Sequence, residues 1–315
     1  MRVPISLILD DGAPVNIMYW THPHERHVNL VPNAFTRAFG EVCATHGVRG
    51  KFSVLPMPAG LGRLDRGLSH VPRGHLSGFL DAVRKRIAPR FDITPELLTH
   101  DVAWNLERNA PGRLFEDAWV SKARVPELTG YLSLALRILN NVGLPANGVT
   151  SPWMTGLDNE RVYAESIARA QWRVNRRRFS WYFLHFVLEK KGRWPWVAWR
   201  DRKKGLTVVS VPALTNDEFW GAQFKTARRA AWAQARAGAD RLLSADGRRG
   251  RVRELFDGDG PIVLITHWQS LFSNGSRAGL RGLDTLCARI NRTFGAEVEW
   301  VTCSELARRS LRRTV

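Results

Sequence analysis

Short apolar runs alternate with longer segments of helical periodicity along the chain. Residues 5–9 form the first apolar run, and the acid pair and glycine that close it are typical of a buried strand ending in a turn. Residues 33–46 carry apolar side chains at the spacing of one helix face and are followed by a glycine. This pattern predicts a helix with a C-terminal stop directly after the first strand and its loop.

The same alternation recurs to the end of the chain. It predicts further strands at residues 50–55, 91–99, 148–151, 173–175, 206–212, 261–266 and 297–302. It predicts further helices at residues 75–88, 126–142, 160–170, 217–239, 277–294 and 304–313. Such alternation, with no Gly/Ser- or Pro-rich linker, favours one α/β domain over residues 1–315 with a mostly parallel sheet. The Trp- and Tyr-rich residues 177–212 are a candidate insertion or lid.

Composition places the chain among ordinary globular proteins, but its charge is unusual. Hydrophobic residues make up 44% of the 315 residues and charged residues 24%, which provides for a sizeable core. The net charge of +18 would attract nucleic acid, anionic glycan or a membrane surface. Because the arginines are spread along the chain without a DNA-reading motif, we expect them on helix exteriors and expect no specific nucleic-acid partner. Nucleic-acid binding through charge alone is one functional hypothesis, in addition to the two that the motifs described below suggest.

The cysteines and the first residues of the chain allow an expectation about the cellular compartment. Cys43, Cys287 and Cys303 lie in no CxxC or zinc-ribbon spacing, which favours a reducing environment. The strand pattern starts within the first five residues without a leader, and no apolar run reaches about 18 residues. We therefore expect a cytoplasmic protein with no membrane partner.

Polar residues follow several of the predicted strands at the point where each ends. Asp10 and Asp11 close the first strand, His100 follows a third, Ser151 follows a fourth, residues 215–217 (Thr-Asn-Asp) follow the strand at 206–212, and His267 closes the run PIVLIT. In a (β/α) barrel the carboxyl ends of the strands meet at one mouth, so these side chains are predicted to share a pocket. The alternative for the acid pair is a turn that caps the following segment.

The motifs around these residues resemble those of the polysaccharide deacetylases, the NodB-homology family, over residues 5–307. LILDDGAP is similar to that family's TFDDGP motif, GVTSPWMTG to its Pro-aromatic motif, and VLITHW to its late strand ending in a catalytic His. The resemblance implies an irregular, seven-stranded (β/α) barrel. It also implies Asp10 as general base, Asp11 and His100 as ligands of a divalent metal such as zinc, and His267 as general acid.

Two positions depart from the family pattern. The family's second metal-binding His would lie four residues after His100, where this chain has Trp104. The family's arginine of the Pro-aromatic motif is replaced by Thr150 or Ser151. The segment YWTHPHERH after the first strand offers His22, His24 and His27, and we take His24 as the candidate third ligand, because His and carboxylate form zinc sites with an open position for water.

The chain contains 13 Trp, a high count. Trp153 and Trp268 stand directly beside motif residues, and with Ser151 they are predicted to contact a carbohydrate substrate. The alternative for any one Trp is packing in the core or a lid.

These observations favour a metal-dependent hydrolase that removes an acyl group from a sugar or related amide. A bound metal would acidify water, Asp10 would take its proton and His267 would protonate the leaving group. The alternative is a catalytically inactive or glycosidase-like barrel that binds glycan, since two carboxyls at a defined separation also serve glycoside hydrolysis.

Overall fold

The central strand is β1 (Val3–Gly12), in a computed structural model that describes residues 2–189 and 192–313. It runs parallel to β12 (Ile262–His267) on one side and to β2 (Gly50–Val54) on the other, and β5 (Phe91–Pro95) extends the sheet beyond β2. A short β13 (Val298–Trp300) also pairs with β1. Every residue of β1 after Val3 is buried, which explains its continuous apolar run.

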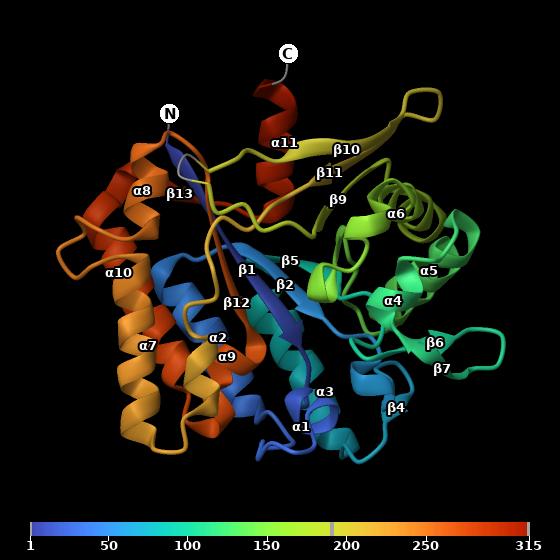
Figure 1. Ribbon diagram of the computed structural model, residues 1–315, viewed down its shortest axis with the longest axis horizontal. Coiled ribbons are helices and arrows are strands. Elements are labelled where there is room, and N and C mark those ends of the chain that lie inside the picture. The colour runs from blue at the N-terminus through green and yellow to red at the C-terminus, as the bar shows by residue number, and fades with distance from the viewer. Residues whose placement is uncertain (1, 190–191, 314–315) are drawn as a thin grey trace.

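A second sheet lies beside the first (Figure 1). Its strands β8 (Gly148–Thr150), β9 (Phe179–Phe183) and β11 (Leu206–Ser210) are parallel, and β10 (Trp196–Asp201) is antiparallel to β11 at the edge. Three of these strands fall in residues 177–212, of which 190–191 lie outside the described residues. The segment expected to be an insertion or lid thus contributes three strands to the second sheet, and most of β9 and β11 is buried.

The two sheets meet at both edges. Glu96, just beyond β5, forms a parallel bridge with Thr150 at the end of β8, and Leu214 donates its backbone N–H to the Val263 carbonyl of β12 at 2.9 Å. The described strands thus give a mixed α/β fold with a parallel central sheet. They are hydrogen-bonded as two main sheets, not as the single closed ladder of the predicted barrel.

Helices surround the sheets. They are α1 (Met18–Thr21), α2 (Asn33–His46), α3 (Arg73–Ala82, continued by a π-turn), α4 (Glu116–Val120), α5 (Val125–Asn141), α6 (Glu160–Asn175), α7 (Arg228–Leu242), α8 (Arg251–Asp257), α9 (Trp268–Phe272), α10 (Ala278–Phe294) and α11 (Cys303–Arg313). Small hairpins are formed by β3 (Gly62–Arg63) with β4 (Gly67–Leu68) and by β6 (Val102–Asn105) with β7 (Ala110–Phe115). In Figure 1, α2, α7 and α10 gather beside the first sheet and α5 and α6 beside the second. The helix predicted at residues 33–46 is confirmed.

Two predicted elements are wrong for local reasons. Residues 173–175 are the last turn of α6, not a strand, and this helix ends only at Arg176, whose φ is 55°. Residues 217–239 do not form one helix, because the Asp217 carboxylate accepts a hydrogen bond from the backbone of Phe219 at 3.0 Å and holds a turn there. A 3-10 turn at Trp220–Phe224 follows, and α7 begins at Arg228.

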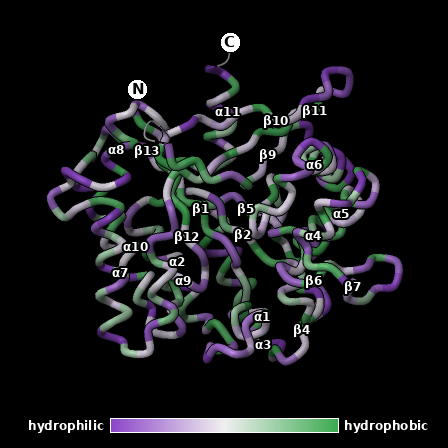
Figure 2. Tube along the Cα trace, in the orientation of Figure 1, coloured by the Kyte–Doolittle hydropathy of each residue, from purple (hydrophilic) through white to green (hydrophobic). Residues whose placement is uncertain are grey.

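The hydrophobic residues line the strands and the inner helix faces, whereas the outer loops are hydrophilic (Figure 2). No helix in the described part of the chain combines the length and apolar character needed to cross a membrane.

Candidate active site

A cavity of about 510 Å³ opens where β1 and β12 end. Six titratable side chains at its wall come from four segments that are far apart in the sequence; they are Asp10 and Asp11, Glu96 and His100, Asp217, and His267. The structure thus brings together Asp10, Asp11, His100, Asp217 and His267, all of them polar residues that follow predicted strands. It adds Glu96 and the buried Lys51, which pairs with Asp10.

Asp11 is aimed into the cavity by an irregularity of β1. The β1–β2 register shifts between Leu9 and Gly12, and Asp11 has a φ of 65°. Its backbone N–H donates to Ser53 Oγ at 3.0 Å and to Glu96 Oε2 at 2.6 Å. Gly12 is required here, because a Cβ would lie 2.2 Å from the Ser53 carbonyl oxygen. The kink therefore separates the two neighbouring carboxylates.

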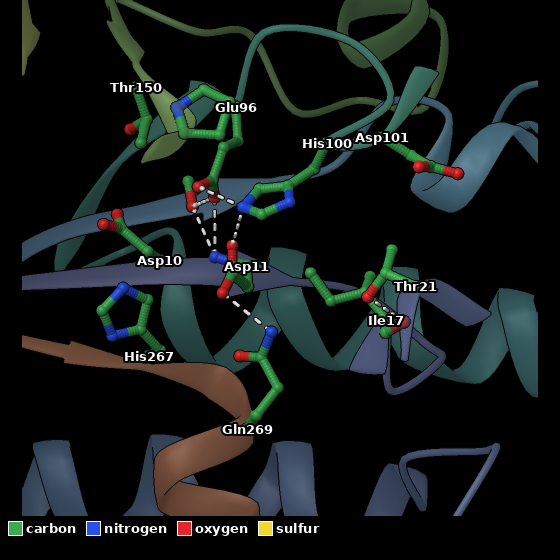
Figure 3. A network of polar contacts seen from close by, with 12 residues as sticks. Asp10, Asp11, Ile17, Thr21, Glu96, His100, Asp101, Thr150, His267 and Gln269 are labelled. Carbon is green, nitrogen blue, oxygen red and sulfur yellow. Dashed lines mark hydrogen bonds and ion pairs between the residues drawn. The ribbon is translucent and has the colours of Figure 1, made fainter. Parts of the chain in front are cut away.

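Asp11, Glu96 and His100 form a buried cluster whose potential ligand atoms all lie within 4.8 Å of one another. His100 Nε2 is 3.1 Å from Asp11 Oδ1 and 3.7 Å from Glu96 Oε1. Gln269 Nε2 donates to the other Asp11 oxygen at 2.8 Å, and Ser53 Oγ donates to Glu96 Oε2 at 2.5 Å. Figure 3 shows the three side chains converging, with Asp10 and His267 beside them.

His100 is held in place through its backbone. Its φ is 54°, and the buried Glu116 carboxylate accepts the N–H groups of Leu98, Thr99 and His100 at 2.8–3.1 Å. Tyr131 donates its hydroxyl to the same carboxylate at 2.6 Å. Glu116 therefore fixes the turn that presents the imidazole.

The electrostatics of the cluster favour a positive charge at its centre. Burial, together with the charges of Asp11 and Asp10, raises the pKa of Glu96 well above its usual value. Burial also opposes ionisation of Asp11, but His100 outweighs it and lowers the pKa of Asp11. Burial disfavours the charged imidazole, yet Asp11 and Glu96 raise the pKa of His100 to about 9.

The same residues fit a divalent metal. Two carboxylates and one imidazole are a suitable oxygen and nitrogen donor set for zinc and similar ions. The nearest cationic group to the buried Asp11 Oδ1 is His100 Nε2 at 3.1 Å, and a metal ion held by both atoms would take the place of the His100 proton. In the absence of a metal, the proton on His100 supplies the compensating charge.

Asp10 lies in a different environment. The fully buried Lys51 donates to Asp10 Oδ1, and to Thr150 Oγ1 at 2.6 Å. Burial raises the pKa of Asp10, and the cations Lys51 and His267 partly offset this. A lysine from β2 is therefore the buried cation that pairs with Asp10.

His267 is paired with Asp217. Its Nδ1 lies 2.7 Å from Asp217 Oδ2, and its backbone N–H donates to the same oxygen at 3.1 Å. Ser270 Oγ also donates to that oxygen at 2.6 Å. Burial opposes protonation, but Asp217 raises the pKa of His267 to about 10. With Nδ1 engaged, Nε2 is the ring atom left to serve another group.

Of the three residues predicted to contact substrate, two line the cavity and one lies in the core. Trp153 lines the cavity, is 48% exposed, and meets the His100 ring edge-on at 4.2 Å between centroids. Ser151 also lines the cavity and donates to the Tyr163 hydroxyl at 2.7 Å. The prediction for Trp268 is wrong. It is 1% exposed, donates Nε1 to the Ala13 carbonyl and packs against Phe35, Phe39 and Phe52 in the core.

The structure does not bring His24 to the cluster. His24 is exposed, whereas its neighbour His22 lines the cavity without belonging to the buried cluster of potential ligands. The third potential ligand atom comes from Glu96. The resemblance placed this ligand four residues after His100, whereas Glu96 lies four residues before it, in the segment ITPELLTH. Lys51 was missed because a lone lysine inside an apolar strand carries no motif.

Comparisons with known proteins give a fold likeness only. No protein-family model matches the chain, and no curated protein matches it. Among solved structures, the GH57-type branching enzyme from the hyperthermophilic archaeon Pyrococcus horikoshii is similar at a TM-score of 0.51 and 13% identity, over 97% of this chain and 70% of that one. This likeness concerns the fold.

Two further structures score lower. The 4-alpha-glucanotransferase from Thermococcus litoralis has a TM-score of 0.49 at 12% identity, and the match covers 97% of this chain but only 40% of that enzyme. A mutant of a CE4 family pseudoenzyme with restored enzymatic activity has a TM-score of 0.44 at 11% identity, covering 97% of this chain and 68% of that one.

Proposed function

We propose that this chain is a metal-dependent hydrolase that removes an acyl group from a carbohydrate or a related amide. The observation that carries the proposal is the placement of the Asp11, Glu96 and His100 cluster beside Asp10 and His267 in one cavity. A carbohydrate substrate agrees with the fold likeness to a branching enzyme. We further propose that the seven parallel strands β1, β2, β5, β8, β9, β11 and β12 belong to one irregular barrel, as the contacts at both sheet edges suggest.

Asp11, Glu96 and His100 would hold the metal, with zinc the ion that we expect. When bound, such an ion acidifies a water molecule and polarises the acyl carbonyl. Gln269 and Ser53 donate to the oxygens of Asp11 and Glu96 that lie outside the shared centre, and so orient these two carboxylates.

The remaining residues move protons. Asp10 accepts the proton of the water that attacks the acyl carbon, and Lys51 keeps this buried carboxylate ionised and oriented. His267 gives a proton from Nε2 to the leaving nitrogen or oxygen as the bond to the acyl carbon breaks. Asp217 holds the imidazole by Nδ1 and maintains its protonated form. Trp153 at the mouth offers an aromatic face on which a sugar ring packs.

A second candidate is a glycan-binding or glycosidase-like protein. Two observations favour it: the fold likeness to a GH57-type enzyme, and the three carboxyls Asp10, Asp11 and Glu96 at one cavity. The two candidates differ in their need for a metal, since glycoside hydrolysis requires only paired carboxyls.

The test combines metal binding with acyl release. Chelator-treated protein is titrated with zinc by calorimetry, and acetate release from N-acetylated chitohexaose is then followed with and without zinc. We expect zinc binding, zinc-dependent acetate release, and loss of both in Asp11→Asn. Asp158→Asn, which changes an exposed carboxyl in the loop after Trp153, is the matched control and should retain both.

Two results would count against the proposal. Equal zinc affinity of Asp11→Asn and the parent would show that Asp11 is not a metal ligand. Tight zinc binding without acyl release from any acetylated sugar would favour the glycan-binding candidate.

A further inference from the structure

A second cavity, of about 490 Å³, lies where α7 and α10 begin. Every charged residue that lines it is a cation, namely Lys225, Arg228, Arg277 and Arg281. The rest of its lining is small and polar, including Ser276 and Thr226, and none of the described lining residues is acidic. We call this cavity the cationic pocket.

The four cations have no carboxylate partner among the described residues, whereas one arginine of α7 and one of α10 do. Arg241 of α7 pairs with Glu218, and Arg289 of α10 pairs with Asp240. Within the described residues, no ion pair is formed by any of the four cations that line the cationic pocket.

Two of the guanidinium groups stack on the same aromatic side chain. Arg228 lies over the Trp232 ring at 4.6 Å from its centroid and Arg281 at 4.3 Å. The indole ring thus holds two cations at the wall of the pocket, and a bound anion would offset their charge. The starts of α7 and α10 add partial positive charge to that of the side chains.

The cationic pocket adjoins the candidate active site. Lys225 directly follows the 3-10 turn Trp220–Phe224, and Trp220 lines the active-site cavity with its ring 5.0 Å from that of His267. The other wall begins at Ser273, directly after α9, which itself follows His267. The turn Trp220–Phe224 packs against α9, so the two elements that contribute Trp220 and Gln269 to the active-site cavity lead directly into the two walls of the cationic pocket.

We propose that the cationic pocket binds an oxyanion group carried by the carbohydrate substrate, so that the chain acts on an anionic glycan rather than a neutral one. This inference rests on the proposed function for the identity of the ligand as a carbohydrate. The planar, five-donor fork of arginine suits phosphate, sulfate and carboxylate alike, and two or more forks in one cavity select a group with several oxygens. An anionic substituent seated there positions the neighbouring acyl group at Asp10 and His267.

The experiment compares three hexasaccharides that carry N-acetyl groups: neutral chitohexaose, a heparosan hexasaccharide with carboxylates, and its 6-O-sulfated form. Binding to the zinc-loaded protein is measured by calorimetry in low salt. The test variant is Arg228→Gln/Arg277→Gln. The control, Arg248→Gln/Arg249→Gln, removes the same charge from the exposed loop at the far end of α10. A second test variant, Lys225→Gln/Arg281→Gln, covers the case in which the first is poorly folded.

We expect at least one anionic hexasaccharide to bind about tenfold or more tightly than chitohexaose. Either test variant should abolish that preference, while the control pair retains it. Whichever of the carboxylated and sulfated sugars binds more tightly identifies the anionic group. If the control pair lost the preference for the anionic sugar as fully as the test variants, the preference would reflect general attraction to positive charge and the proposal would be overturned. Binding of chitohexaose as tightly as the anionic hexasaccharides would overturn it as well.

The experiment distinguishes failure of the cationic-pocket proposal from failure of the proposed hydrolase function. If the anionic sugar binds through the cationic pocket but releases no acetate, the proposed hydrolase is wrong and the pocket stands. If acetate is released equally from neutral and anionic sugars by all variants, the pocket proposal is wrong and the hydrolase stands.

Discussion

The two halves of the active-site cavity each pair a histidine with a buried aspartate, yet their charges balance differently. In the ligand half, Asp11 and Glu96 face a single imidazole, His100. In the proton half, Asp10 and Asp217 face two cations, Lys51 and His267. With both carboxyls ionised and His100 protonated, the ligand half carries a net charge of one negative unit. With His267 protonated, the two cations of the proton half balance its two carboxylates, so that half is neutral. This difference indicates that the first is suited to a cation and the second to proton transfer.

Adjacent residues supply the two halves. Asp10 and Asp11 are consecutive, but the register shift and the positive φ of Asp11 send their carboxylates to different partners. Burial raises the pKa of Asp10, whereas interaction with His100 overcomes burial and lowers the pKa of Asp11. The local backbone thus gives one dipeptide two chemical roles.

The largest effect is expected from Asp10→Asn, which removes the base but leaves the ligand half intact. Acetate release should fall by about 10²–10⁴-fold, the usual range for loss of a general base. Zinc affinity by calorimetry should stay close to that of the parent, because Asp10 is not in the ligand cluster. Full activity of this variant on a substrate that the parent hydrolyses would remove Asp10 from the mechanism.

Lys51→Met tests whether the proton half balances its own charge. The substitution leaves the Asp10 carboxylate buried without its partner, which should lower the free energy of unfolding by about 3–5 kcal/mol. The double variant Lys51→Met/Asp10→Asn should recover part of this loss, because the uncompensated charge is gone. Urea unfolding measures both, with the exposed Lys122→Met expected within about 0.5 kcal/mol of the parent. An equally unstable double variant would attribute the loss to packing.

Glu96→Gln separates ligands from supporting residues. Loss of a supporting contact around a metal typically costs about 10–100-fold in affinity, so loss of a direct ligand should weaken zinc binding by at least that factor. Glu116→Gln is the matched comparison, since Glu116 contacts only the backbone N–H groups and Tyr131 around His100, and should cost less. A larger effect of Glu116→Gln in the zinc titration would reverse this assignment.

Much of the site was predictable because its residues close or follow strands. Asp10, Asp11 and His267 stand at strand ends and His100 stands in the turn after β5, and parallel strands bring their carboxyl ends together. Lys51 and Trp268 were not predictable in this way, because the inner or outer direction of a side chain depends on register and packing. Trp268 follows a motif His but points into the core, and Lys51 lies within an apolar strand but points to Asp10.

The ends and breaks of the elements were less predictable than their order. The turn at Asp217 replaces the start of a predicted helix because its carboxylate accepts hydrogen bonds from Thr266, His267 and Ser270, some 50 residues away. Helical periodicity carries no information about such tertiary contacts. The third potential ligand, Glu96, lies four residues from His100, which is the spacing of the family motif. It precedes His100, however, whereas the motif has its second ligand after it.

Asp217→Asn should give the smallest effect, and it tests the proton half by titration alone. The pKa of His267 is raised to about 10, chiefly by Asp217 against the opposing effect of burial. Removal of the carboxylate should therefore move the pKa of His267 down toward its usual value of about 6.5. NMR titration of the ring in metal-free protein measures this, with Asp158→Asn as a control that leaves the pKa unchanged. An unaltered pKa in Asp217→Asn would assign the shift to Asp10 and Asp11 instead.

The same variant has a consequence for stability with a defined sign. A pKa that is higher in the folded than in the unfolded state means that the folded protein binds the His267 proton more tightly. The resulting stabilisation is fully present below about pH 6.5 and is lost as the pH rises through about 10. The difference in free energy of unfolding between the parent and Asp217→Asn should hence be largest near pH 6 and shrink toward pH 10, when followed by urea unfolding across this range. A constant difference would mean that Asp217 stabilises the fold through its bonds to Ser270 and the backbone rather than through the charge of His267.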